Sequence, residues 1–141
     1  MRYRIIAVGR VKDEGVRSAC DEYLTRLGHY AKVEETEVKD EARILGSIPE
    51  GSRLVALSRA GDAWTSRALA ERTARWEMEG RDVEFAIGGA DALPAGVLGR
   101  ADSTWSLSAL TLPHELARLI VLEQLYRAYT IRRGEPYHRG P

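Results

Sequence analysis

The sequence predicts an α/β fold, with a mainly parallel β-sheet and helices on both faces of that sheet. Apolar runs typical of buried strands alternate along the chain with helical patterns, which is the order of a parallel sheet joined by crossover helices. The 141 residues suit one compact domain with a core of its own, and no repeat, low-complexity tract or linker divides them. We therefore expect a single domain over residues 1–141.

The N-terminal part contains a predicted strand, a helix and a weaker second strand. Residues 2–8 (RYRIIAV) form the first apolar run, and apolar residues then recur at three- and four-residue spacing over residues 16–27. Gly28 marks the end of that helix. In residues 31–38 two adjacent glutamates interrupt the apolar alternation, so we place this strand at an edge of the sheet.

The middle of the chain contains two short buried strands and the helix between them. Residues 53–57 (RLVAL) form a strand followed by a loop over residues 58–64, and Thr65 or Ser66 is a suitable N-cap for a helix to about residue 79. The next strand, residues 83–87 (VEFAI), ends abruptly at a glycine pair.

The C-terminal part contains a short strand, a loop and the last helix. We expect the strand at residues 105–107 and the loop at residues 108–112. The helix begins near Pro113, because proline suits the first helical turn, and continues to about Arg132.

Composition excludes several classes of protein. No run approaches the roughly 18 apolar residues that span a membrane, and the N-terminus lacks the apolar core and cleavage site of a signal peptide. The single cysteine, Cys20, cannot form an internal disulfide, and no Cys/His cluster has the spacing of a zinc site. We expect a cytoplasmic protein without a bound metal.

Positive charge is concentrated at the C-terminus, although the formal net charge is zero. Four arginines and a histidine lie there against one glutamate, and tyrosines accompany them. Planar rings beside guanidiniums suit RNA bases and phosphates. The alternative is a solvated tail, with at least one of Tyr126 and Tyr129 in core or dimer packing. The RNA-binding candidates are Arg127, Arg132, Arg133 and Arg139.

Three strand ends form the predicted ligand site, because open α/β sheets bind ligands beyond the carboxyl ends of their strands. The glycine pair after residues 83–87 would let the backbone approach a ligand closely, because glycine has no β-carbon. A tight turn would also explain this pair. No dinucleotide or nucleoside triphosphate motif is present. The apolar loop at residues 107–112 suits an adenosine without phosphates. The alternative is that these residues form only a buried strand and a turn. The candidates are Leu57, Gly88, Gly89, Leu107, Ser108, Ala109, Leu110, Thr111 and Leu112.

The string WSLSALTLPHELARLIVLEQLYRAYTIRRGEPYHR at residues 105–139 resembles the C-terminal signature of the ribosomal RNA large-subunit pseudouridine N3-methyltransferases, a branch of the knotted SPOUT superfamily. The likeness extends through GRDVEFAIGGADAL, LVALSRAG, DEYLTRL and RIIAVGR, and so covers essentially the whole chain. Ser58 stands where the family often has aspartate, and Ala92 where it often has a third glycine.

The resemblance implies a fold, a cofactor and a substrate. It implies a C-terminal deep trefoil knot that binds S-adenosylmethionine at the three strand ends named above. It implies a homodimer in which the partner's C-terminal tail completes each active site. The implied substrate is a pseudouridine in a stem-loop of 23S rRNA within the assembled ribosome. A last helix with apolar residues around much of its circumference also favours a dimer.

The chemistry of methyl transfer to N3 calls for a general base and a positive group, and the C-terminal residues 137–139 offer candidates for both. The N3 of pseudouridine is a poor nucleophile until its proton leaves, so a general base would help, and histidine titrates near neutral pH. His138 is the leading candidate, with Tyr137 or a purely positional role as the rival, and His114 is a weaker one. Arg139 could stabilise negative charge on the base.

Two other functions remain open at this point. The first is a SPOUT methyltransferase that acts on transfer RNA or on another rRNA position. The second is a ribosome-associated or RNA-binding factor that keeps the fold without turnover.

Overall fold

The computed structural model describes residues Met1–Pro141, and its centre is a five-stranded sheet in the order β2-β1-β4-β3-β5. Every pair of neighbouring strands is parallel. The strands are β1 (Arg2–Val8), β2 (Lys32–Val38), β3 (Arg53–Ala63), β4 (Val83–Ile87) and β5 (Ser103–Ser106). The helices are α1 (Glu14–Leu27), α2 (Ser66–Glu79), α3 (Ala95–Arg100) and α4 (His114–Arg132).

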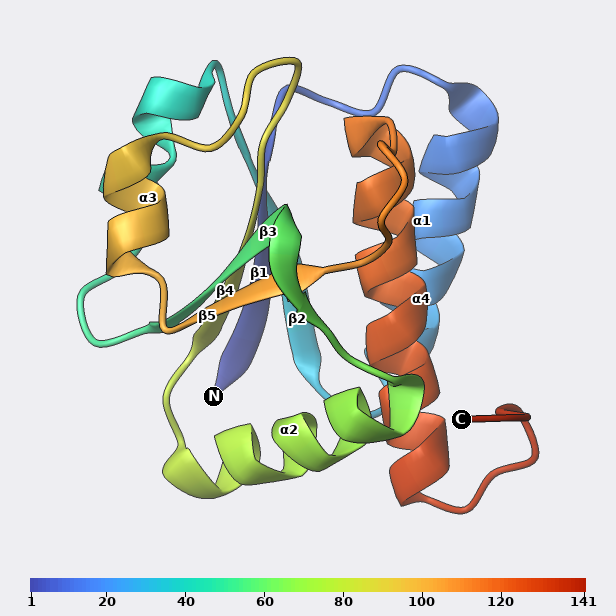
Figure 1. The fold of residues 1–141 in the computed structure, drawn as a ribbon. Coiled ribbons are helices and arrows are strands. Elements are labelled where there is room, and N and C mark those ends of the chain that lie inside the picture. Colours follow the sequence, from blue (N-terminus) through green and yellow to red (C-terminus); the bar gives the residue numbers. More distant parts are fainter.

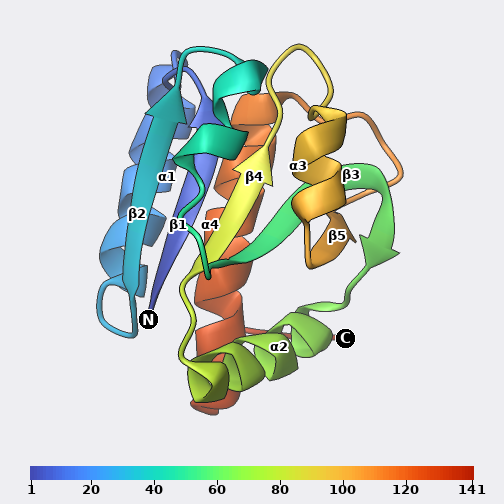
Figure 2. The same ribbon diagram turned by 90° about the vertical axis from the view of Figure 1, so that its left-hand side faces the viewer.

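Helices cover both faces of the sheet, as the sequence predicts (Figures 1 and 2). The larger core lies between the sheet and α1, α2 and α4, where Tyr3, Phe85 and Leu122 are fully buried. The smaller core, around Leu54 and Val97, lies on the opposite face beneath α3 and two 3-10 helices, Glu41–Arg43 and Leu45–Ser47. Neighbouring residues of β1, β3 and β4 therefore enter different cores.

The helices begin and end largely where their capping residues predict. Thr65, rather than Ser66, is the N-cap of α2, and its hydroxyl accepts a hydrogen bond from the backbone N–H of Ala68 at 3.0 Å. Gly80 ends the same helix in the left-handed conformation at φ 76°, which glycine adopts without strain. Pro113 precedes α4 directly, in agreement with the predicted start of the last helix.

Three details differ from the sequence prediction. Strand β3 does not end at Leu57 but continues to Ala63, and it leaves the register of β5 between Leu57 and Asp62. Strand β5 ends at Ser106 rather than at residue 107. Helix α3 and both 3-10 helices were not predicted, because each is too short to show a period in the sequence.

The sheet order brings the three predicted strand ends together. Strands β4, β3 and β5 are adjacent and parallel, so their carboxyl ends lie at one edge of the molecule. Helix α4 begins at this edge and runs back along the sheet, which carries the C-terminal tail to the opposite end (Figure 1). The trefoil knot that the resemblance implies stays a prediction.

Candidate active site

A cavity of about 380 Å³ lies at the carboxyl ends of β4 and β5, beside the middle of β3 and the first turn of α4. Hydrophobic side chains make up 11 of its 18 lining residues, so its interior is largely apolar. Seven of the nine cofactor-site candidates line it, namely Leu57, Gly88, Gly89, Leu107, Ser108, Leu110 and Leu112. The other two, Ala109 and Thr111, belong to the same loop but point to solvent.

Strand β3 contributes an unexpected part of the wall. Because β3 leaves the register of β5 after Leu57, the next three residues bulge out of the strand, and Ser58, Arg59 and Ala60 line the cavity. Gly61 permits this bulge, since a β-carbon there would stand 2.5 Å from the backbone oxygen of Thr104 on β5. The sequence marked this stretch as a glycine-bearing loop, but the strand pairing that shapes it was not predictable.

The floor of the cavity is aromatic and its rim is charged. Trp105 is buried and stacks on Trp64, with ring centroids 5.0 Å apart and planes 15° from parallel. Arg59 and Asp91 lie at the rim with His114, and none of the three forms an ion pair within the chain. A flat apolar ligand with charged groups at one end fits such a cavity.

The glycine pair is required by the protein's own packing. A β-carbon on Gly88 would stand 2.9 Å from the backbone oxygen of Asp91, within the same loop. A β-carbon on Gly89 would stand 2.7 Å from a carboxylate oxygen of Glu41, which accepts a hydrogen bond from the Gly89 N–H at 3.2 Å. The tight turn therefore explains both glycines, and it also brings their backbone to the cavity wall.

The loop before α4 is shaped by Ser108. The Leu110 N–H donates to the Ser108 hydroxyl at 3.0 Å, and the Ser106 hydroxyl donates to the Ser108 carbonyl at 3.1 Å. This turn leaves the Leu110 side chain 70% exposed at the mouth of the cavity. Backbone groups of the loop are thus near the cavity, as the sequence predicts for an adenosine site.

Tyr137 is fixed against α4. Its hydroxyl donates to Glu123 at 2.9 Å and lies 3.2 Å from the hydroxyl of Tyr23, and its ring meets Tyr126 edge-on at 4.8 Å. Burial, followed by the hydrogen bonds with Tyr23 and Glu123, raises the pKa of Tyr137 above its ordinary value. The phenol is therefore a poor base in this arrangement.

Both ring nitrogens of His138 have partners. Nδ1 lies 3.1 Å from the Arg127 guanidinium, which can only donate, and Nε2 lies 2.7 Å from the Gly140 carbonyl, which can only accept. These partners assign a neutral ring with its proton on Nε2. To accept a proton from a substrate, Nδ1 of His138 must exchange its contact with Arg127 for a contact with the RNA base.

The four RNA-binding candidates differ in their surroundings. Arg127 pairs with Glu123 at 2.9 Å, and Arg132 pairs with Glu77 at 2.7 Å, so both charges are compensated within the chain. Arg133 lies over the ring of Tyr30, 5.2 Å from its centroid. Arg139 is exposed and forms no ion pair.

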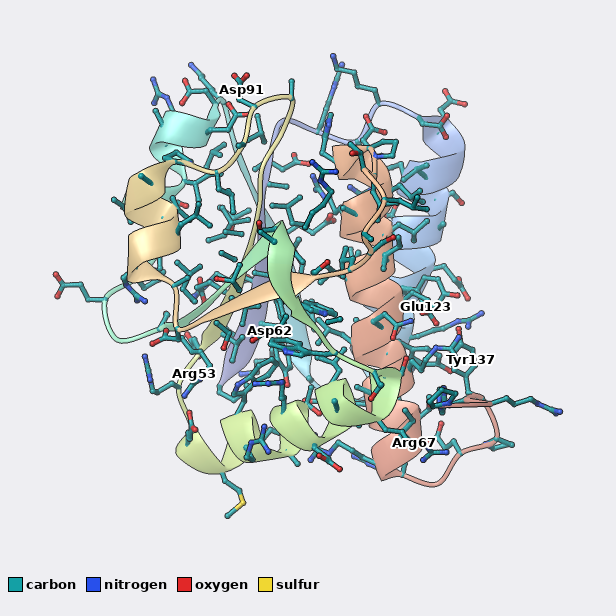
Figure 3. All side chains as sticks on the ribbon, viewed as in Figure 1. Arg53, Asp62, Arg67, Asp91, Glu123 and Tyr137 are labelled. Carbon is teal, nitrogen blue, oxygen red and sulfur yellow. The ribbon has the colours of Figure 1, made fainter.

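The tail and the cavity lie far apart in one chain. None of the tail residues lines the cavity, and the 19 residues of α4 separate the two, a length of about 28 Å at the helical rise of 1.5 Å per residue. In Figure 3 the labelled Tyr137 lies beside the end of α4, well away from Asp91 at the cavity rim. One chain by itself therefore does not assemble all of the predicted site.

The comparisons with known proteins agree on one family. The model of a family described as "Predicted SPOUT methyltransferase" matches residues 1–138. A relative from Sorangium cellulosum (strain So ce56) is 47% identical over 97% of this chain and 99% of its own length, and one from Anaeromyxobacter sp. (strain Fw109-5) is 46% identical over 99% of this chain and 100% of its own. Both are named "Ribosomal RNA large subunit methyltransferase H".

The chain belongs to the SPOUT methyltransferase family. It is therefore a methyltransferase, and its reaction requires a methyl donor. A solved structure from Haemophilus influenzae Rd KW20, described as a probable methylase family protein, has the same fold, with a TM-score of 0.63 at 11% identity over 98% of this chain and 70% of that one. The fold class that the sequence predicts is confirmed.

Several lining residues of this methyltransferase were not predicted from its sequence. Arg59, Asp91 and Trp105 line the cavity through the β3 bulge, the turn after the glycine pair and strand β5. Proximity to the predicted candidates is the only sequence signal that marks them. No group of three or more His, Cys, Asp or Glu side chains is arranged to hold a metal ion, and no helix is both long and apolar enough to cross a membrane.

Proposed function

We propose that this methyltransferase transfers a methyl group from S-adenosylmethionine to N3 of a pseudouridine in a stem-loop of 23S rRNA, within the assembled ribosome in the cytoplasm. The observation that carries the proposal is the apolar cavity beside three adjacent strands, in a chain whose close relatives over their full length are named as ribosomal RNA large subunit methyltransferases.

The cavity suits S-adenosylmethionine in volume and in chemistry. Its volume lies within the usual range of ligand sites, roughly 300 to 1,000 Å³. Its apolar walls and the backbone of the loop before α4 suit an adenosine without phosphates, and the opposite charges of Asp91 and Arg59 suit the amino-acid end of the donor. When bound, S-adenosylmethionine supplies a methyl group already activated on a sulfonium. The chain must then align the acceptor and exclude water.

A homodimer would bring a tail to each cavity. The tail of one chain lies about 28 Å along α4 from its own cavity, at a helical rise of 1.5 Å per residue, so a second copy must supply it. The outer side of α4 offers Leu116, which is 38% exposed, and Ile120 one turn later, which packs on neither core cluster. An apolar strip of this kind suits the self-complementary contact of a two-fold dimer.

The partner's tail would supply the groups that act on the base. His138, with Nδ1 released from Arg127, would accept the N3 proton, and Arg139 would stabilise the negative charge that spreads onto the carbonyl oxygens. Tyr137, whose hydroxyl already donates to Glu123, would hold the tail in position rather than act as a base. His114 lines the donor cavity, which suits a contact with the donor better than one with the RNA.

Methylation of purified ribosomes with donor carrying a labelled methyl group tests the proposal. We expect label in 23S rRNA of the large subunit, and none when the substrate carries uridine in place of pseudouridine. Label in transfer RNA or at another rRNA position would replace the target with that of a different SPOUT methyltransferase. Binding to ribosomes without any transfer of label would favour the non-catalytic factor.

A further inference from the structure

Most arginines of this chain are compensated by carboxylates, and those that are not are unevenly placed. Eleven of the 18 arginines form an ion pair within the chain. Four of the remaining seven lie on α2 or in the tail beside it, namely Arg67, Arg72, Arg75 and Arg139. A chain with no net charge thus carries uncompensated positive charge in one region.

Helix α2 and the tail form a continuous surface. The backbone N–H of Arg67 donates to the Pro141 carbonyl at 3.2 Å, and the ion pair between Arg132 and Glu77 joins the end of α4 to α2. Figure 3 shows Arg67 next to the tail, near the end of α4. We call the region defined by Arg67, Arg72, Arg75 and Arg139 the α2–tail surface.

The acidic residues of α2 do little to neutralise this surface. Glu77 is paired with Arg132, and Glu79 is paired with Arg53 at 2.6 Å, which leaves Glu71 as the unpaired carboxylate of the helix. Arg67 and Arg75 are both exposed, and eight residues separate them, about 12 Å along the helix axis. The surface therefore presents several positive charges to solvent over a distance that suits an extended polyanion.

Arg72 adds a flat stacking element to the same surface. Its guanidinium lies 3.9 Å from the centroid of the Trp64 ring, which also stacks on Trp105 of the cavity floor. Partial burial, followed by the positive charge of Arg75, lowers the pKa of Arg72, and the carboxylate of Asp62 opposes this shift only in part. Neighbouring cations repel one another here, and an anion bound among them would relieve that repulsion.

We infer that the α2–tail surface binds the phosphate backbone of the RNA substrate. The inference rests on the proposed function, and it moves the main RNA contact from the paired arginines of α4 to the unpaired ones of α2 and the tail. If the tail acts at the partner's cavity, α2 of the same chain lies beside that cavity too. The RNA is then held mainly by one protomer while the other presents the methyl donor.

The salt dependence of RNA binding tests this inference directly. Each lost phosphate contact lowers the slope of log K against log salt by about 0.7 to 0.9. For the double variant Arg67→Gln and Arg75→Gln we expect a slope shallower by about 1.5 than that of the parent protein, and binding weaker by about tenfold at 0.1 M salt. The probe is the 23S rRNA stem-loop, measured by fluorescence anisotropy.

The matched control removes two positive charges that are already compensated. Arg2 pairs with Glu34 and Arg43 pairs with Asp40, so Arg2→Gln with Arg43→Gln changes the net charge equally at positions away from α2. We expect this control to keep the parent slope. Equal slopes for the two double variants would overturn the inference.

The result is separable from the proposed function. A parent protein that binds the stem-loop with the expected slope but transfers no methyl group would contradict the proposed function and leave the surface assignment intact. If the parent protein is active and the Arg67→Gln and Arg75→Gln variant binds RNA as the parent does, the surface assignment is contradicted and the proposed function stands.

Discussion

Gly88 has no room for a β-carbon, because the Asp91 carbonyl stands 2.9 Å from where that carbon would be. We expect Gly88→Ala to displace the turn that forms the cavity wall, and so to weaken binding of S-adenosylmethionine by at least about tenfold, roughly 1.4 kcal/mol. Titration calorimetry measures this. Gly99→Ala is the control, since a β-carbon on Gly99 meets nothing within 4 Å. Equal donor affinities for the two variants would contradict this role of Gly88.

His138 is proposed to act on the RNA base and not on the donor. We therefore expect His138→Ala to lower the single-turnover rate of methylation by about a hundredfold or more, in the usual range for a general base, with no change in donor affinity. Quenched-flow assays with labelled donor and calorimetry check the two halves of this statement. A normal single-turnover rate in this variant would rule out the base.

Sequence reasoning located the cavity wall at the residue scale but missed its charged rim. Leu57 and Gly88 could be predicted because they lie where the apolar runs of two buried strands stop, and such points meet in a parallel sheet. Arg59 and Asp91 could not, because their positions depend on a register shift and a turn. The compensation of Arg127 was accessible, since Glu123 lies four residues earlier on the same predicted helix.

Helices α2 and α4 are joined by a polar contact at the edge of the main core. Glu77 of α2 accepts hydrogen bonds from Tyr129 and Arg132 of α4, and the hydroxyl of Tyr129 also lies 2.9 Å from that of Tyr3 on β1. Burial raises the pKa of Tyr3 to about 12. This contact fixes the end of α4 from which the tail departs.

The stability that Glu77 contributes should depend on pH. The Arg132 hydrogen bonds, with a further one from Tyr129, lower the pKa of Glu77 below its ordinary 4.5. A carboxylate whose pKa is lower in the folded state stabilises the fold above its unfolded pKa, and this stabilisation disappears as the pH falls through the folded value. We expect Glu77→Gln to cost about 1 kcal/mol at pH 7, because Glu77 is partly exposed, and less at pH 3.

Urea unfolding at the two pH values measures this difference. Glu71→Gln is the matched control, because Glu71 is exposed on the same helix and has no ion pair. A loss of stability in Glu77→Gln that is the same at pH 3 and pH 7 would contradict the role of the charge.

At the scale of elements, helices with clear caps were predictable and short or irregular elements were not. The N-cap candidates Thr65 and Ser66 and the expected end near residue 79 placed α2 within a residue, because caps leave a local signal in the sequence. The extension of β3 to Ala63 leaves no such signal, since residues 58–63 are mostly exposed and only Asp62 and Ala63 pair with β5, 43 residues later. Strand pairing between segments so far apart in the sequence depends on the whole fold.

The whole molecule is expected to work as a dimer, and the outer side of α4 is the proposed contact. Ile120→Glu would place a charge in that contact while leaving the core of each chain intact. We expect this variant to sediment as a monomer that still binds S-adenosylmethionine but transfers no methyl group. Met78→Glu, at a side chain that is 89% exposed on α2, should sediment as the parent does. A dimeric, active Ile120→Glu variant would place the contact elsewhere.

The net charge of the molecule could be predicted from the sequence, but the positions of its unpaired arginines on the surface could not. The zero net charge and the basic C-terminus are plain in the sequence. Which arginines remain unpaired is set by the fold, which brings Glu77 to Arg132 and leaves Arg67 and Arg75 exposed. The sequence therefore predicted RNA binding at the same end of the molecule as the surface proposed from the fold, through partly different residues.

The central claim is that the donor cavity of one chain and the tail of another form one methyltransferase site. Heterodimers of two inactive chains test it most directly, one chain carrying Leu110→Arg in the exposed mouth of the cavity and the other carrying alanine at Tyr137, His138 and Arg139. Two different affinity tags allow these heterodimers to be purified. One of the two sites is then intact, so the account predicts about half of the parent's methylation rate per dimer. Heterodimers as inactive as either variant alone would contradict it.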